Sequence, residues 1–141
     1  MTDKIISAKN VELKFGKGSE EVVALKNVSL EVSAGEFVSF IGPSGCGKTT
    51  FLRTVAALEK PTSGQILVNG VLPDEARTDR AYGYVFQSAG LYPWRTIFKN
   101  VSLPLEIMKY SREEISKRVS KSLNLVELNG FEKKFPWQLS G

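Results

Sequence analysis

The chain has 141 residues, of which 42% are hydrophobic and 24% charged, a composition typical of one soluble globular domain that buries a core. Its 19 basic and 15 acidic residues give a net charge of +4, and because the basic residues are spread along the chain, we expect no nucleic-acid binding. No apolar run resembles a signal peptide or approaches the length of a membrane span, and the single cysteine fits a reducing compartment. These properties favour a cytoplasmic protein.

Alternating apolar residues predict antiparallel strands in the first part of the chain. Val11, Leu13 and Phe15 alternate with charged residues, and after a glycine-containing interruption the pattern resumes over residues 22–32. Residues 65–69, which follow a Pro-Thr-Ser-Gly turn and end at Asn-Gly, predict a further strand.

Two shorter segments, rich in aromatic and β-branched residues, also predict strands. They are residues 36–41, which lead into Gly42, and residues 82–86, which lead into Gln87. Between them, residues 50–58 carry apolar side chains at helical spacing and stop shortly before a proline, so we expect a helix there. Up to Gln87 the pattern indicates a mixed sheet.

A glycine-rich segment joins the first of these two strands to the helix. It matches the phosphate-binding pattern G-x-x-x-x-G-K-[ST] and consists of Gly42, Pro43, Ser44, Gly45, Cys46, Gly47, Lys48, Thr49 and Thr50. Glycines let several backbone N–H groups approach a polyphosphate, while Lys48 reaches the terminal phosphates and the Thr49 hydroxyl ligates Mg²⁺. A glycine-rich turn that fits the pattern by chance is the alternative. A strand before the segment and a helix after it favour a nucleoside triphosphate site.

Helical patterns replace the strands in the second half of the chain. Residues 88–95 predict a loop that carries two aromatic side chains. Residues 97–107 predict a helix that Pro104 should bend or interrupt. Ser111 and Glu114 form a capping-box pattern that opens another helix, whose apolar stripe consists of Ile115, Val119 and Leu123.

The phosphate-binding segment, Gln87 and the final Leu139-Ser140-Gly141 together resemble the nucleotide-binding subunit of ATP-binding cassette (ABC) transporters. The resemblance extends over essentially the whole chain, and Gln138-Leu139-Ser140-Gly141 is similar to the start of the family signature L-S-G-G-Q. It implies an α/β fold with a P-loop NTPase (ABC ATPase) core, an antiparallel β subdomain and the start of an α-helical subdomain, incomplete. We expect the β-rich and phosphate-binding portion in residues 1–87, and the Q-loop and partial helical portion in residues 88–141.

The resemblance also implies roles for single residues. Phe15 stands where the family places an aromatic side chain that stacks on adenine, with a core residue of an edge strand as the alternative. Gln87 resembles the Q-loop glutamine that approaches Mg²⁺ and the attacking water, with a plain polar residue at a strand end as the alternative. Gln87 and Lys48 would be the catalytic residues, and Gln87 and Thr49 would hold the metal. Nucleotide contacts would also come from Leu139, Ser140 and Gly141.

The loop after Gln87 carries the expected partner contacts. The resemblance implies that residues 88–96 contact a transmembrane permease, with Tyr92 and Trp94 either as exposed anchors or as packing between the helical part and the sheet. Leu91-Tyr92-Pro93-Trp94-Arg95-Thr96 is similar to the branch of nitrate, sulfonate, taurine and pyrimidine-precursor importers, which indicates a small anionic or heterocyclic solute. A second ATPase subunit and, indirectly, a solute-binding protein are the other expected partners, at the inner face of the cell membrane.

Some family residues would fall after Gly141. They are an Asp that helps to hold Mg²⁺, a Glu that activates water, and a His at the γ-phosphate, and the sequence contains no histidine. We therefore expect the 141 residues alone to bind ATP with Mg²⁺ but hardly to hydrolyse it. The alternatives are a truncated ATP-binding fragment, a non-transport ABC ATPase, and a P-loop kinase, for which a substrate lid and no Leu-Ser-Gly signature would be expected.

Overall fold

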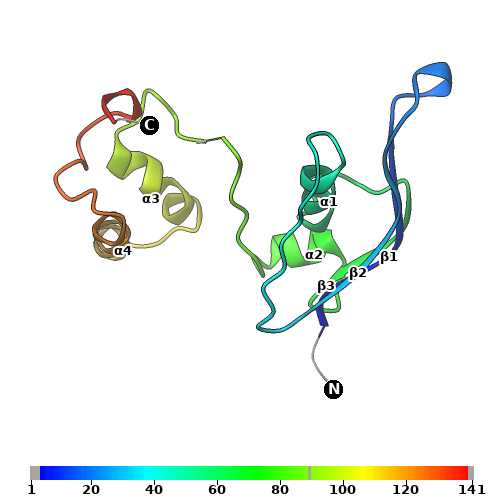
Figure 1. The fold of residues 1–141 in the computed structure, drawn as a ribbon. Coiled ribbons are helices and arrows are strands. Elements are labelled where there is room, and N and C mark those ends of the chain that lie inside the picture. The colour runs from blue at the N-terminus through cyan, green and yellow to red at the C-terminus, as the bar shows by residue number, and fades with distance from the viewer. Residues whose placement is uncertain (1–3, 89, 140–141) are drawn as a thin grey trace. The chain divides into compact units, whose positions relative to one another are not determined.

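The computed structural model describes residues 4–88 and 90–139, and the chain divides into two compact units, residues 1–85 and residues 86–141. The first unit contains an antiparallel sheet (Figure 1). Its strand order is β2-β1-β3, with β1 paired to both neighbours. The strands are β1 (Lys4–Phe15), β2 (Val22–Ser33) and β3 (Ser63–Val68), and η1 (Gly18–Glu20) lies between β1 and β2. The predicted antiparallel strands in this part of the chain are therefore confirmed.

Irregular pairing along β1 keeps its apolar side chains on one face. Ala8 and Val11 differ by an odd number of residues, which would place them on opposite faces of a regular strand. The β1–β2 register shifts between them, at Asn10, whose φ is 50° and whose N–H donates to Ser29 Oγ at 2.9 Å. This bulge restores the phase, so that Ala8, Val11 and Leu13 are all buried in the same cluster.

Two helices supply the other layer of this core. They are α1 (Lys48–Val55) and α2 (Pro73–Thr78), which Figure 1 shows next to the sheet. Phe51 of α1 and Ala76 of α2 are buried in one cluster with the apolar residues of the three strands. The core therefore fixes α1, and with it the segment that precedes α1, on the sheet.

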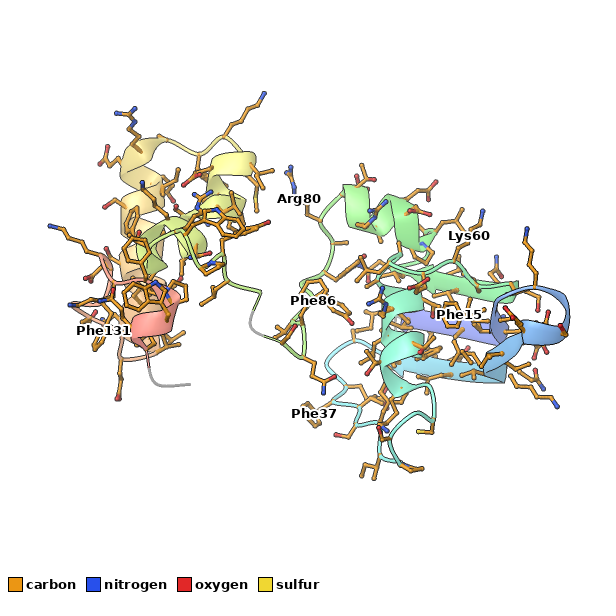
Figure 2. All side chains as sticks on the ribbon, turned by 90° about the horizontal axis from the view of Figure 1, so that it is seen from above. Phe15, Phe37, Lys60, Arg80, Phe86 and Phe131 are labelled. Carbon is orange, nitrogen blue, oxygen red and sulfur yellow. The ribbon has the colours of Figure 1, made fainter. Side chains whose placement is uncertain are left out.

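The structure forms no strand over residues 36–41 or residues 82–86, and both predictions are wrong for the described chain. A strand is held by hydrogen bonds to a neighbour, and no described strand pairs with either segment. Their apolar side chains are consequently left in contact with solvent. Phe37, labelled in Figure 2, is 92% exposed, Ile41 is 96% exposed and Val85 is 95% exposed.

The second unit is helical, as its sequence predicts. It contains α3 (Ile97–Ile107), α4 (Arg112–Leu125) and the short η2 (Pro136–Gln138). Its core consists of the buried Ile97, Val119 and Leu123, and half-buried residues including Ile115 and Leu139 pack against them.

The structure confirms the predicted cap of α4 but not the predicted interruption of α3. Ser111 caps α4, because its hydroxyl accepts a hydrogen bond from the Glu114 N–H at 3.2 Å. Pro104 does not interrupt α3, which continues to Ile107 and closes with a hydrogen bond from the Met108 N–H to the Pro104 carbonyl.

No helix in the described ranges has the length and apolar character that a membrane crossing requires.

Candidate phosphate-binding site

The glycine-rich segment leads into the first turn of α1, and Gly47 is the residue at which the chain enters the helix. Gly47 has φ 92° and ψ 1°, a left-handed conformation that glycine adopts without steric cost. As a glycine it offers no side-chain cap, so the N–H groups of the first turn have no side-chain acceptor at that position. The first turn also contains no acidic residue. The start of α1 is therefore suited to an anion.

Lys48, the first residue of α1, turns its ammonium group back over this segment. Its Nζ donates to the carbonyl oxygens of Gly42 at 2.7 Å and of Pro43 at 2.6 Å, and it lies 3.4 Å from Cys46 Sγ. A positive charge and the N–H groups at the start of a helix thus lie in one segment of nine residues, 42–50. This set of donors suits a polyphosphate, and the binding of nucleotide at these residues stays a prediction.

Aromatic packing connects the segment to the core on its N-terminal side. The rings of Phe40 and Phe51 lie 5.6 Å apart between centroids and are tilted by 58°. Because Phe51 is a buried residue of α1, this contact holds the chain next to Gly42 although no strand forms there. The predicted helix is present, beginning at Lys48 and ending at Val55 instead of spanning residues 50–58.

The remaining predicted site residues are divided between the two units. Phe15 belongs to the first unit with residues 42–50; it lies at the end of β1, where it pairs with Val22, and it is 43% exposed (Figure 2). Gln87 and Leu139 belong to the second unit, where Gln87 is exposed and Leu139 is half-buried. The predicted Ser140 and Gly141 lie outside the described residues.

Asn100, which none of the sequence patterns singles out, organises the loop after Gln87. Asn100 is buried near the start of α3, and its side-chain amide makes four hydrogen bonds to backbone atoms of that loop. The loop places Tyr92 and Trp94 with ring centroids 5.2 Å apart, and Trp94 is 72% exposed. An Asn four residues after a Thr N-cap is the only sequence signal for this arrangement.

An ion pair anchors the same loop to the far end of α3. Arg95 Nη2 lies 3.1 Å from Glu106 Oε1 and 3.0 Å from Glu106 Oε2. Hydrogen bonds from the Ser102 hydroxyl and from Arg95 hold the pKa of Glu106 below its ordinary value. The carboxylate therefore stays ionised and keeps its hold on Arg95 in mildly acidic solution.

The fold and the site define a P-loop nucleotide-binding domain. A family model described as ABC transporter matches residues 25–141, and the chain belongs to this family. The predicted fold class is confirmed, because solved ABC cassettes share the fold. A dimeric post-hydrolysis structure of the ATP-binding cassette MJ0796 bound to ADP and Pi has a TM-score of 0.80 and 41% identity, over 96% of this chain and 63% of that chain. Another dimeric MJ0796 structure has a TM-score of 0.82 and 42% identity over the same shares.

Curated relatives include ATP-binding proteins of importers. The chain is 44% identical over 140 residues to the spermidine/putrescine import ATP-binding protein PotA of Nitrosomonas eutropha, covering 97% of this chain and 37% of that protein. It is 45% identical over 134 residues to the Fe(3+) ions import ATP-binding protein FbpC of Pasteurella multocida, covering 94% and 37%. The uncharacterized ABC transporter ATP-binding protein MJ0412 of Methanocaldococcus jannaschii is 42% identical over 136 residues, covering 96% and 50%. The chain thus spans between 37% and 50% of the length of these relatives.

Proposed function

We propose that the chain is part of the ATP-binding domain of an ABC importer ATPase, and that residues 42–50 hold the nucleotide and Mg²⁺. The observation that carries this proposal is the position of the Lys48 ammonium group, which lies over the segment that opens α1. An ammonium group and helix-start N–H groups are the donors that a triphosphate requires. The names of the import relatives support the transport part of the proposal.

Each residue of the site has a defined task in this proposal. Lys48 would exchange its two carbonyl acceptors for phosphate oxygens, which places a positive charge where negative charge develops during phosphoryl transfer. Thr49 would supply a hydroxyl ligand to Mg²⁺, and Gln87 would approach the metal and the attacking water. Phe15 is half-exposed and would offer its ring to adenine. Leu139, Ser140 and Gly141 would complete the phosphate site of a second copy.

The proposed partners follow from the loop after Gln87. The segment from Ser88 to Thr96 would contact transmembrane permease subunits through exposed aromatic side chains such as Trp94. The whole protein would work as a dimer at the cytoplasmic face of the membrane, with a solute-binding protein as an indirect partner. The dimeric cassettes of similar fold support the second copy.

The proposed solute is small and anionic or heterocyclic. This proposal is based on residues 91–96 alone, because the curated relatives are named for spermidine/putrescine and Fe(3+) import. Uptake assays on cells that lack the gene, with nitrate, taurine, spermidine and Fe(3+) as competing candidates, would distinguish these classes.

For the 141 residues alone we propose binding of ATP with Mg²⁺ and negligible hydrolysis. Hydrolysis needs a carboxylate that activates water, and the family resemblance places that residue after Gly141. Steady turnover that Lys48→Ala abolishes, at a rate comparable with that of a full-length relative, would contradict this part of the proposal.

Calorimetric titration with ATP and Mg²⁺ tests the site. Lys48→Ala should weaken binding by about tenfold or more, because a charge-assisted hydrogen bond to phosphate is lost. Lys60→Ala is the matched control, since Lys60 is an exposed lysine outside residues 42–50, labelled in Figure 2. Equal affinity of the wild type and Lys48→Ala would refute the assignment, as would equal losses in both variants.

A further inference from the structure

We propose that Asn100 is a positioning residue that joins the loop after Gln87 to the segment before Leu139 through the first turn of α3. A partner bound on Tyr92 and Trp94 would then act on the segment before Leu139 as well. The inference deepens the proposed function and rests on it, because it concerns how the permease contact is passed on within the second unit.

The first part of the connection is the set of hydrogen bonds between the Asn100 side chain and the loop backbone. Asn100 Nδ2 donates to the carbonyl oxygens of Tyr92 at 3.0 Å, Arg95 at 2.9 Å and Thr96 at 3.1 Å. Its Oδ1 accepts from the Tyr92 N–H at 2.8 Å. Asn100 is only 8% exposed, so its side-chain amide has little access to water as a replacement partner. One side chain therefore fixes both ends of the turn from Tyr92 to Thr96.

The second part is a pair of backbone hydrogen bonds at the start of α3. The Ile97 N–H donates to the Lys134 carbonyl at 2.8 Å, and the Phe98 N–H donates to the Glu132 carbonyl at 2.9 Å. These donors belong to the first helical turn, which has no acceptors within its own helix. The segment 132–134 supplies the acceptors, and so it follows any displacement of the residues directly after Thr96.

The third part is side-chain packing around Ile97. Ile97 is 2% exposed and belongs to the cluster against which Leu139 packs. Ile97 thus bonds to the segment before Leu139 through its backbone N–H, and its side chain belongs to the cluster on which Leu139 packs. Ile97 also directly follows Thr96, whose carbonyl accepts a hydrogen bond from Asn100. Closely packed contacts of this kind transmit displacements instead of absorbing them.

Amide hydrogen exchange on the 141-residue chain, followed residue by residue by NMR, tests the connection. In Asn100→Ala, the amides of Tyr92, Ile97 and Phe98 should all exchange at least about tenfold faster, as expected when one net hydrogen bond is lost. Val119 and Leu123 in α4 should keep their wild-type rates, which separates loosening of the connection from unfolding of the unit. Asn129→Ala, which removes an exposed asparagine of the same unit, is the control and should change none of these rates.

A variant at the other end of the connection makes the test reciprocal. Leu139→Ala removes packing from the Ile97 cluster, and coupling requires that it also speed exchange of the Tyr92 amide, which lies in the loop. If Asn100→Ala speeds Tyr92 alone, or if Leu139→Ala leaves Tyr92 at its wild-type rate while Ile97 exchanges faster, the proposal is overturned. It is also overturned if the Ile97 and Phe98 amides are unprotected in the wild type.

Titration of the same samples with ATP and Mg²⁺ separates this proposal from the proposed function. Residues 42–50 belong to the first unit, so Asn100→Ala should bind the nucleotide with wild-type affinity. If the wild type fails to bind ATP, the proposed function fails, whereas the exchange data still decide whether Asn100 couples the two segments.

Discussion

Gly47 lies against Ala24 of β2, so closely that a Cβ added to Gly47 would stand 2.7 Å from the Ala24 carbonyl oxygen. The same Cβ would stand 3.0 Å from Leu25 Cδ2. Glycine at this position therefore does more than open the backbone to phosphate, because it also lets the segment rest on the sheet. The contact places the start of α1 at a fixed point on β2.

Gly47→Ala should lower the free energy of unfolding of the first unit more than Gly45→Ala does. Both glycines have positive φ, 92° and 79°, so alanine costs about 1–2 kcal/mol at either position. At Gly45 the added Cβ would meet no heavy atom of the described chain within 4 Å, whereas at Gly47 it would meet β2. Overpacking adds about 1–3 kcal/mol at Gly47 alone.

Urea denaturation of the two variants measures this difference. Because both glycines have positive φ, the loss in Gly45→Ala measures the cost of alanine at positive φ, and the excess loss in Gly47→Ala measures the contact with β2. Equal losses of stability would show that the contact with Ala24 contributes nothing.

Tyr82→Phe should lower the free energy of unfolding by about 1 kcal/mol. The Tyr82 hydroxyl donates to the Ala56 carbonyl at the end of α1 at 2.7 Å, and both residues belong to the first unit. Tyr110→Phe is the control, because no hydrogen bond of the Tyr110 hydroxyl is seen among the described residues. Thermal unfolding of the three proteins checks the prediction, and equal midpoints would contradict it.

The second unit should lose stability in acid through Glu106. Hydrogen bonds from Ser102 and Arg95 lower the pKa of Glu106 in the folded state, so its contribution is complete above the unfolded value of about 4.3 and disappears as the pH falls through the folded value. Glu106→Gln should therefore be less stable than the wild type at pH 7, and the difference should shrink below about pH 4.

Unfolding of the wild type, Glu106→Gln and Glu127→Gln between neutral and acid pH checks this dependence. Glu127 is an exposed glutamate of the same unit for which no side-chain hydrogen bond is seen in the described ranges, so its variant should follow the wild type. A wild-type advantage over Glu106→Gln that stays constant into strong acid would argue against the role of the ion pair.

Local patterns predicted those parts of the fold whose partners lie within the described chain. The alternation around Val11 and Leu13 predicted β1, which pairs with β2 and β3. The capping pattern at Ser111 predicted the start of α4. Residues 36–41 and 82–86 have equally good strand patterns, but a strand also needs a neighbour, which a local pattern does not supply.

In the site, too, the sequence predicts which residues carry the chemistry, but not the contacts that depend on packing between distant segments. The spacing of Gly42, Gly47 and Lys48 predicts the phosphate-binding segment because each residue acts through its own backbone or charge. The approach of Gly47 to Ala24 depends on the packing of α1 against β2, and the bonds of Asn100 depend on how residues 92–96 turn back. Neither relationship leaves a distinct pattern in the sequence.

The most direct test of the central claim is an NMR titration of the ¹⁵N-labelled 141-residue chain with ATP and Mg²⁺. The account predicts that the amide resonances of Gly45, Gly47, Lys48 and Thr49 move in a saturable way, because their N–H groups would turn to the phosphates, and that those of α4 stay in place. In Lys48→Ala the same movements should need about tenfold more nucleotide. Saturable shifts confined to other residues, or no shifts at residues 45–49 in a folded protein, would contradict the account.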